Sequence, residues 1–285
     1  MKWRYQLALW ALRTKIKILS SVSKSAAAKS AFDLFCTPMV RTKSSLPPVF
    51  TKAEHLSLHW QSYRLRGFRW NKGGSKKALI IHGFQSSCTN FHAYAEALME
   101  HGYEVVAVDA PAHGGSSGTK INLIIYKDLI LYLQQTFGPF DAAMAHSFGG
   151  LALTLALEEW PSTPLPKIAL IAPASETSTA ITQFFDSMQI KDPKVVAGFY
   201  QIIHQLYQKP ADWYSVKRVL PKLNTPVLWI HDEDDTITPI ADAEKIWALS
   251  IPQLRIVRTK GLGHRQVYKN PASVSEVMNH FTSTT

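Results

Sequence analysis

The chain has 285 residues, 46% of them hydrophobic, so it is long enough to bury a sizeable core, and one main domain is expected. Its two cysteines, Cys36 and Cys88, exclude a disulfide framework and lack metal-binding spacing, which fits a reducing, cytoplasmic location. The net charge of +10 lies at the start: residues 1–52 hold ten Lys and Arg and one acid, whereas residues 53–285 are almost balanced.

Residues 1–52 are predicted to form a basic helical arm. The arm begins MKWRYQLALWALRTKIKIL, where the apolar run LALWAL is too short to cross a membrane and Lys15 and Lys17 follow it. No small-residue cleavage site follows, so a signal peptide is not expected. On a helical wheel the polar residues gather on one side, namely Lys2, Gln6, Arg13 and Lys17.

Two interpretations of this arm stay open. The favoured one is a helix docked on the protein's own surface, with its charges in solvent. The second is peripheral membrane contact by an interfacial helix, which would make a cytoplasmic protein membrane-associated. Nucleic acid is not expected as a partner, because no binding motif accompanies the charge.

Residues 53–285 are predicted to form the main domain. The segment HLSLHWQSYRLRGFRW (55–70) alternates in parts and predicts an antiparallel hairpin. Short apolar runs then alternate with helical patterns, from KALIIHG (77–83) to KIALIAPA (167–174). This alternation is typical of a mostly parallel central sheet with helices on both faces, an α/β fold.

The alternation stops over about residues 175–225, which predicts a small helical lid inserted over the carboxyl edge of the sheet. This insertion is rich in large apolar side chains: Phe184, Phe185, Met188, Phe199, Tyr200, Tyr207, Trp213 and Tyr214. They either face an apolar substrate or pack the insertion's own helices onto the sheet.

One serine has the sequence context of a nucleophile. Ser147 lies in MAHSFGG (144–150), after the apolar run FDAAMA and before a helical pattern. A serine hydroxyl is a weak nucleophile, so it needs a base, a group that orients the base, and donors for the oxyanion. A strand-to-helix turn would expose this hydroxyl, although a small residue in a Gly-rich turn is the alternative.

Candidates for the base and its orienting acid follow later in the chain. Asp235 lies in HDEDDTITP (231–239), at the end of the predicted strand PVLWI. His264 lies in GLGHR (261–265), on a Gly-flanked loop after the predicted strand QLRIVRTK. The order Ser, Asp, His along the chain is the order that one fold uses for a catalytic triad.

Together these motifs resemble the α/β-hydrolase superfamily, from about residue 55 to residue 285. The segments that carry the resemblance are HGFQSS (82–87) for HGxxxS, DAPAHGGS (109–116) for DxPGHGxS, AHSFG (145–149) for GxSxG, HDEDDTITP for HGxxDxxVP, and GLGH for GxGH. The departures are Ala112, Ala145 and Asp232 in place of Gly, and Thr238 in place of Val. None of them removes a triad group.

The resemblance implies an α/β-hydrolase fold and a triad of Ser147, His264 and Asp235. It selects Asp235 over Asp234 by the spacing to the proline of its motif. It also implies an oxyanion hole made by the backbone N–H groups of Phe84 and Phe148, whose side chains would line the acyl site.

Other residues near the same strand ends have plainer interpretations. Four histidines, His82, His113, His146 and His231, could suggest a metal site, but no HxH or HxxxH pair occurs among them, so no metal is expected. Cys88 is either a redox-sensitive thiol or, as we favour, a small buried residue.

The sequence therefore predicts a serine hydrolase that cleaves an ester or thioester of a small acyl substrate, without a cofactor. One alternative is hydrolysis of another bond, an amide or a carbon–carbon bond, on the same fold. The other is a non-catalytic binding protein that kept the fold.

Overall fold

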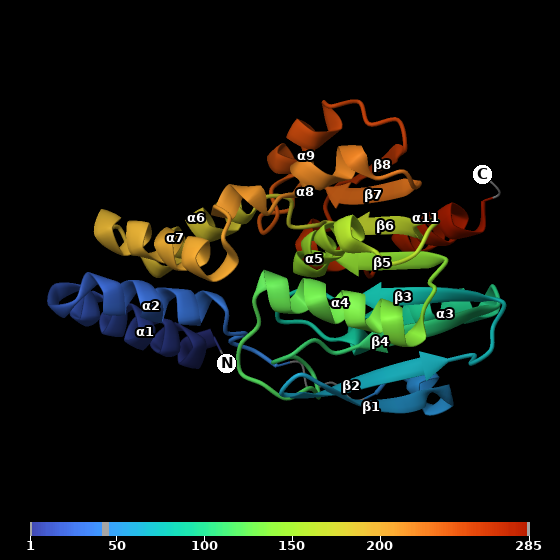
Figure 1. The fold of residues 1–285 in the computed structure, drawn as a ribbon, viewed down its shortest axis with the longest axis horizontal. Helices are drawn as coiled ribbons and strands as arrows, with labels where there is room; N and C mark the ends of the chain where they lie inside the picture. Colours follow the sequence, from blue (N-terminus) through green and yellow to red (C-terminus); the bar gives the residue numbers. More distant parts are fainter. Residues whose placement is uncertain (1, 42–45, 284–285) are drawn as a thin grey trace. The chain divides into compact units, whose positions relative to one another are not determined.

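The computed structural model describes residues 2–41 and 46–283. Within them, eight strands form one sheet of order β1-β2-β4-β3-β5-β6-β7-β8 (Figure 1). The strands are β1 (Glu54–Trp60), β2 (Tyr63–Trp70), β3 (Lys76–Ile81), β4 (Tyr103–Val108), β5 (Ala142–His146), β6 (Lys167–Ile171), β7 (Val227–Asp232) and β8 (Leu254–Thr259). Strands β1 and β2 form the expected antiparallel hairpin, β2 pairs antiparallel with β4, and all further pairs are parallel.

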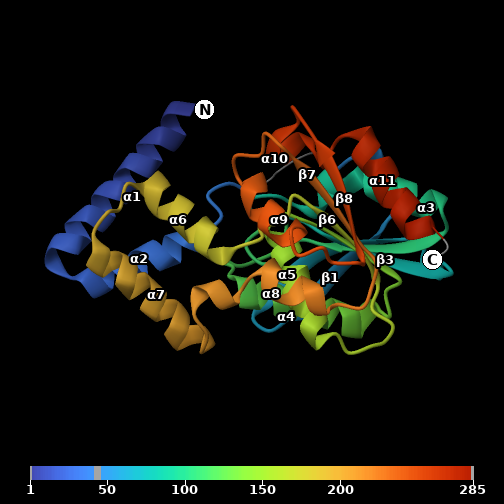
Figure 2. The same cartoon turned by 90° about the horizontal axis from the view of Figure 1, so that it is seen from above.

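Helices cover both faces of this sheet, as the sequence predicted. Figure 2 shows the sheet between two helical layers. The helices of one layer are α3 (His92–Glu100) and α11 (Pro271–Thr282), and those of the other are α4 (Leu123–Phe137), α5 (Phe148–Ala156) and α8 (Val216–Val219). Two further helices follow strands β7 and β8, namely α9 (Ile240–Trp247) and α10 (Gly263–Gln266).

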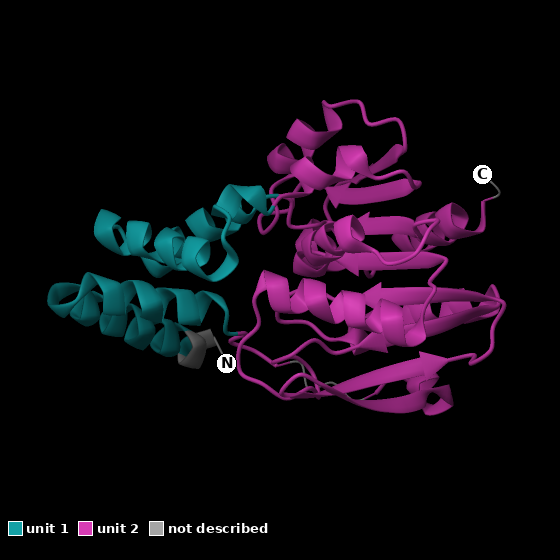
Figure 3. Cartoon of the chain, in the orientation of Figure 1, with its two compact units in different colours: residues 1–37, 176–214 teal, residues 38–175, 215–285 magenta. Residues whose placement is uncertain are grey.

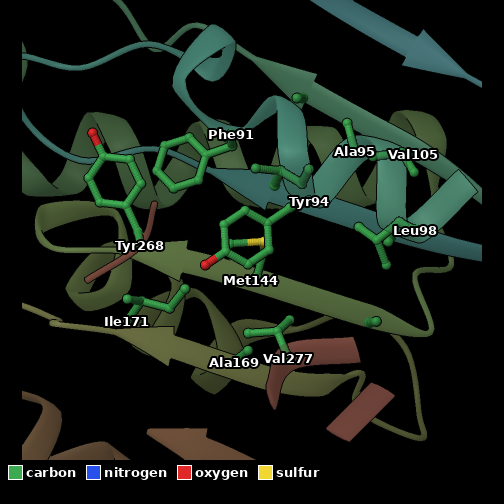
Figure 4. Close-up of a cluster of buried hydrophobic side chains, with 14 of the residues drawn as sticks. Phe91, Tyr94, Ala95, Leu98, Val105, Met144, Ala169, Ile171, Tyr268 and Val277 are labelled. Atoms are coloured by element: carbon green, nitrogen blue, oxygen red, sulfur yellow. The ribbon is translucent and has the colours of Figure 1, made fainter. Parts of the chain in front are cut away.

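The central strands are buried along their whole length because both of their faces are covered. Every residue of β4 (YEVVAV) and β5 (AAMAH) is buried, as expected for strands inside a two-sided parallel sheet. On the α3 side, Phe91, Tyr94 and Leu98 pack over Met144, and Val277 of α11 joins the same cluster (Figure 4). This packing fixes the strands whose carboxyl ends carry the site.

The chain divides into two compact units (Figure 3). Unit 2 comprises residues 38–175 and 215–285 and contains the sheet and its covering helices. Unit 1 combines residues 1–37 with residues 176–214, so it joins the N-terminal arm to most of the insertion. Its helices are α1 (Lys2–Val22), α2 (Lys24–Phe35), α6 (Thr177–Met188) and α7 (Pro193–Tyr207).

Unit 1 has an apolar core of its own. The ring of Phe199 on α7 meets the rings of Phe32 and Phe35 on α2 edge to face, at centroid distances of 5.5 and 5.6 Å. Helix α2 approaches α7 closely: a Cβ added to Gly198 would lie 2.9 Å from the Cβ of Ala28. An Ala-rich helix face and a glycine therefore let two helices pack at short range.

Polar contacts fix the same helices in register. Lys24 at the start of α2 pairs with Asp192, the N-cap of α7, at 2.5 Å, and the Ser20 hydroxyl donates to the same carboxylate. The Arg13 guanidinium of α1 donates to the Ser187 carbonyl of α6. The side chain of Lys2, assigned above to the polar side of the arm, lies outside the described part of the chain.

This core explains the aromatic residues of the insertion. Phe185 and Phe199 are buried in it, and Phe184 and Tyr200 pack against it, whereas Trp213 is 41% exposed. They pack helices together within unit 1, where their partners are α1 and α2. The physical reason is that the arm supplies apolar helix faces that match those of α6 and α7.

Candidate active site

Ser147 occupies a sharp turn between β5 and α5. Its backbone has φ +55° and ψ −125°, an uncommon conformation for a residue other than glycine, which is found at functional turns. The turn is held at β6, because the N–H of Ser147 donates to the Ile171 carbonyl at 3.1 Å. A Cβ on Gly149 would come within 2.4 Å of the His82 carbonyl, so this position of the motif requires glycine.

His264 joins the serine to a carboxylate. Its Nε2 lies 2.9 Å from Ser147 Oγ, and its Nδ1 lies 2.8 Å from Asp235 Oδ2. Because an ionised carboxylate only accepts, Nδ1 carries the proton and Nε2 offers its lone pair to the serine hydroxyl. The structure thus brings together Ser147, His264 and Asp235 from three separate loops in the geometry that a serine nucleophile needs.

The Asp235 carboxylate is buried and fully engaged. Its Oδ1 accepts the N–H groups of Ile237 and Thr238 at 2.8 and 2.9 Å, and the Thr238 hydroxyl donates to Oδ2 at 2.8 Å. Burial alone would raise the pKa of Asp235, but the His264 hydrogen bond and charge, with the Thr238 donors, hold its pKa below the usual value. The side chain is therefore an anion that faces His264.

The neighbouring Asp234 has a different place. Its side chain accepts the N–H of Gly261 at 2.9 Å, in the loop that leads to His264. The residue is exposed, whereas Asp235 is buried. The carboxylate selected by its spacing to the proline is thus the one that contacts the imidazole.

Asp232 connects the acid loop to the histidine loop. Its buried carboxylate accepts the Gly263 N–H at 2.8 Å, the Leu262 N–H at 3.1 Å and the Thr259 hydroxyl at 2.7 Å. Burial would raise the pKa of Asp232, but these donors together lower it below the usual value. A carboxylate at a position where the superfamily pattern has glycine therefore holds the two residues that precede His264.

Two buried histidines support the same loops. The Trp229 indole donates to Nδ1 of His231, so Nε2 carries the proton and donates to the Thr238 carbonyl at 2.7 Å. His146 Nε2 lies 3.1 Å from the His264 carbonyl, and the rings of His146 and His264 are 4.6 Å apart. Burial lowers the pKa of both His146 and His231, so both are neutral near pH 7.

The segment after β3 brings Phe84 beside the serine turn. The rings of Phe84 and Phe148 meet edge to face at 5.8 Å, and a Cβ on Gly83 would lie 2.9 Å from the Cβ of Ser147. The two residues predicted to supply oxyanion donors thus lie next to each other and close to Ser147. Phe148 opens helix α5, so its N–H is among those that an α-helix leaves without an intrahelical partner.

His82 and His113 shape this segment. His82 Nε2 accepts the Ala110 N–H at 2.9 Å, and His113 Nε2 accepts the Gln85 N–H at 2.9 Å. Burial lowers the pKa of His82, and burial followed by the charge of His82 lowers the pKa of His113 to about 3. Both therefore act as neutral acceptors of backbone N–H groups.

Two observations concern the candidate metal ligands and the Cys88 thiol. Among residues 2–41 and 46–283 there is no group of three or more His, Cys, Asp or Glu side chains placed to hold a metal ion. Burial, followed by the nearby Asp109 carboxylate, raises the pKa of the Cys88 thiol well above its usual value. A buried thiol of this kind is a poor nucleophile.

Sequence reasoning singled out the three residues that meet at Ser147 but missed those that hold them. Thr238 and Asp232 appeared only as departures from a motif, and His146 and His231 only as histidines without metal spacing. The departures from the motif at Asp232 and Thr238 were the signal that could have found these residues. A buried Asp in place of a Gly requires several hydrogen-bond donors nearby.

The comparisons with known proteins concern the family and the fold of the chain. The model of a family described as "Serine aminopeptidase, S33" matches residues 75–216, about half of the chain. None of the curated proteins matches the sequence. With the motifs, the sheet and the site taken together, the chain belongs to the α/β-hydrolase superfamily.

Several solved structures have a similar fold. An esterase of Pyrococcus furiosus is 18% identical, with 86% of this chain and 97% of that chain covered and a TM-score of 0.63. An esterase of Exiguobacterium antarcticum is 16% identical, with 78% and 96% covered and a TM-score of 0.59. A membrane phospholipase A described as a bacterial virulence factor is 18% identical, with 98% of each chain covered and a TM-score of 0.59.

Proposed function

We propose that this hydrolase cleaves a carboxylic ester or thioester through an acyl-enzyme on Ser147. The observation that carries the proposal is the pair of hydrogen bonds on His264, 2.9 Å to Ser147 Oγ and 2.8 Å to Asp235 Oδ2. A serine, a neutral imidazole and a buried carboxylate in this order are the groups that acyl transfer needs.

In the first half of the reaction Ser147 Oγ attacks the acyl carbonyl while His264 Nε2 takes its proton. The negative charge of Asp235 stabilises the imidazolium that forms. The carbonyl oxygen becomes an oxyanion, which the N–H groups of Phe84 and Phe148 receive. The tetrahedral intermediate then collapses, and His264 gives its proton to the departing alcohol or thiol.

In the second half a water molecule takes the place of the leaving group. His264 Nε2 removes a proton from it, and the hydroxide attacks the acyl carbonyl on Ser147. Collapse of this second intermediate releases the carboxylic acid and returns the proton to Ser147 Oγ. The chain's own residues supply each proton transfer, so the scheme calls for no cofactor.

The proposal of ester chemistry is supported by the names of the similar structures, which include two esterases and a phospholipase. The description of the matching family as a serine aminopeptidase favours a second candidate, hydrolysis of an amide. The two share every step above except the leaving group, which is an amine in the second case.

The test compares wild type and Ser147→Ala on p-nitrophenyl esters of increasing acyl length and on aminoacyl p-nitroanilides. We expect ester turnover by wild type and a loss of roughly 10⁴-fold or more in the variant, as for other triad nucleophiles. Circular dichroism confirms that the variant folds. If the wild-type protein hydrolyses the anilides but not the esters, the proposed substrate is an amide and not an ester. Near-normal ester turnover by folded Ser147→Ala would refute the mechanism.

A further inference from the structure

Helix α1 has two apolar faces, and only one of them is used in the core of unit 1. Ile16 is 2% exposed, and Leu9, Leu12 and Leu19 pack against the same core. No described helix is both long and apolar enough to span a membrane, α1 included.

The other face of α1 carries an exposed apolar stripe. Its large members and their exposed fractions are Trp3 65%, Leu7 55%, Trp10 62%, Ile18 60% and Val22 83%. At 3.6 residues per turn these positions fall within an arc of about 120° that points away from Ile16. Five of the twelve large hydrophobic side chains exposed in the described residues thus lie on this one helix.

Basic residues border the stripe on both sides. Lys15 and Lys17 are exposed and, by the same helical geometry, lie just outside its two margins. The helix contains five basic residues and no acidic one, and residues 1–37 hold seven Lys and Arg against a single acid, Asp33. Any surface that covers the stripe therefore meets cationic side chains along both margins.

We infer that the exposed face of α1 lies in the headgroup region of an anionic lipid surface. Trp, Leu, Ile and Val enter the boundary between headgroups and acyl chains, and the bordering lysines pair with lipid phosphates. A second copy of this chain fits the face less well, because pairing of identical helices would place like charges along both margins.

This inference does not depend on the proposed hydrolase activity. It requires only that α1 keep its inner face on unit 1 while its outer face meets lipid. The helix lies parallel to the lipid surface and does not cross it.

The first test is sedimentation of the full chain with vesicles of phosphatidylcholine, alone or mixed in equal parts with phosphatidylglycerol. We expect binding to the mixed vesicles that weakens as salt is added, and weak binding to the neutral ones. Lys15→Gln/Lys17→Gln should reduce the binding and flatten its salt dependence. Trp10→Glu should weaken binding about tenfold or more, since it places a charge in the apolar stripe.

Leu249→Glu is the matched control, because Leu249 is 46% exposed and lies in unit 2. It makes the same change of charge and should leave binding unchanged. The inference would be overturned if the wild-type protein bound neither kind of vesicle, or if Trp10→Glu bound the mixed vesicles as tightly as the wild type does. The inference would also be overturned if the wild-type protein bound no vesicles but formed a dimer, and if Trp10→Glu dissociated that dimer. The stripe would then be the contact surface for a second copy of the chain.

A second measurement covers the case in which Trp10→Glu does not fold. Brominated lipid quenches tryptophan that enters the acyl region, and the conservative Trp10→Phe variant removes one such ring while keeping the face apolar. We expect wild type to be quenched on mixed vesicles and Trp10→Phe to be quenched less. Equal quenching of the two proteins would contradict the placement of Trp10 in lipid.

Discussion

The loops at the carboxyl edge of the sheet and the helices of unit 1 are held by different forces. The loops contain buried charges and imidazoles, each tied to named donors or acceptors, as Asp232 and Asp235 are. Unit 1 is held mainly by rings and small apolar side chains, with a few polar contacts at helix ends. A network of hydrogen bonds fixes the orientation of the groups that it joins, whereas apolar packing mainly holds side chains close together. Changes in the loops should therefore affect rate, and changes in unit 1 should affect stability.

The largest effect is expected at the acid of the triad. Asp235→Asn removes the charge that faces His264, and an amide that donates to Nδ1 favours the wrong tautomer, so turnover should fall by about 10³- to 10⁴-fold. Asp234→Asn is the control, because that side chain contacts only the Gly261 N–H in the described structure and should retain turnover within about threefold. Ester kinetics measure both. If Asp234→Asn loses more turnover than Asp235→Asn, the acid of the triad is Asp234 and the assignment to Asp235 is wrong.

The core of unit 1 is tested by Phe199→Ala. Phe199 is fully buried among aromatic rings, and truncation of such a ring typically costs about 3 to 5 kcal/mol of stability. Denaturant unfolding measures the change, and hydrogen exchange should locate the loss of protection in residues 1–37 and 176–214. Leu206→Ala is the matched control on the same helix, where Leu206 is 56% exposed, and it should cost less than about 0.5 kcal/mol. Equal effects of the two substitutions would contradict the core described for unit 1.

Asp232→Asn should act on rate through the position of His264. An amide in this place keeps one accepting oxygen but turns an NH₂ group toward N–H donors, so the loop that precedes His264 shifts. Displacements of about 1 Å at a catalytic group cost about 10²-fold, so we expect kcat to fall about 10- to 100-fold with little change in KM. Glu233→Gln, an exposed neighbour, is the control. A change in KM alone would show that Asp232 acts on substrate binding instead.

The smallest effect concerns acid stability. Burial lowers the pKa of His113 to about 3 in the folded chain, against 6.5 without burial, so the unfolded chain takes up this proton first as the pH falls. The stability that His113 contributes is therefore complete above pH 6.5 and is lost between pH 6.5 and about 3.

At a slope of about 1.4 kcal/mol per pH unit, His113 should account for about 2 kcal/mol between pH 6.5 and 5. Urea unfolding at the two pH values measures this. His113→Gln, which does not titrate, should show a loss smaller by that amount. An unchanged pH dependence in His113→Gln would contradict the assignment.

The sequence alone predicts the sheet and the meeting of Ser147, Asp235 and His264 well, for a physical reason. Parallel strands have their carboxyl ends at one edge, so polar residues that follow β5, β7 and β8 come together there. The hairpin and the alternation of strands and helices follow from short-range periodicity, which is read directly from the residues.

Two features are beyond that kind of reading. The partners of Asp232 before His264, namely Thr259, Leu262 and Gly263, lie 27 to 31 residues away in the chain, so only the folded loops show that its carboxylate holds the His264 segment. The pairing of α2 with α7 joins residues more than 160 positions apart, and the apolar face of an isolated helix does not identify the surface that covers it. The sequence thus left open whether the arm docks on protein or on lipid. The structure shows that one face of α1 packs in the core of unit 1 while the opposite face is exposed.

The central claim is that His264 activates Ser147 as the nucleophile. It is tested most directly by exposing the wild-type protein to a fluorophosphonate probe, digesting it and mapping the modified peptide by mass spectrometry. The account predicts a single adduct on Ser147 that forms at least about 10³-fold more slowly in His264→Ala, because the serine has then lost its base. An adduct on another residue, no adduct at all, or labelling of Ser147 that does not depend on His264 would contradict it.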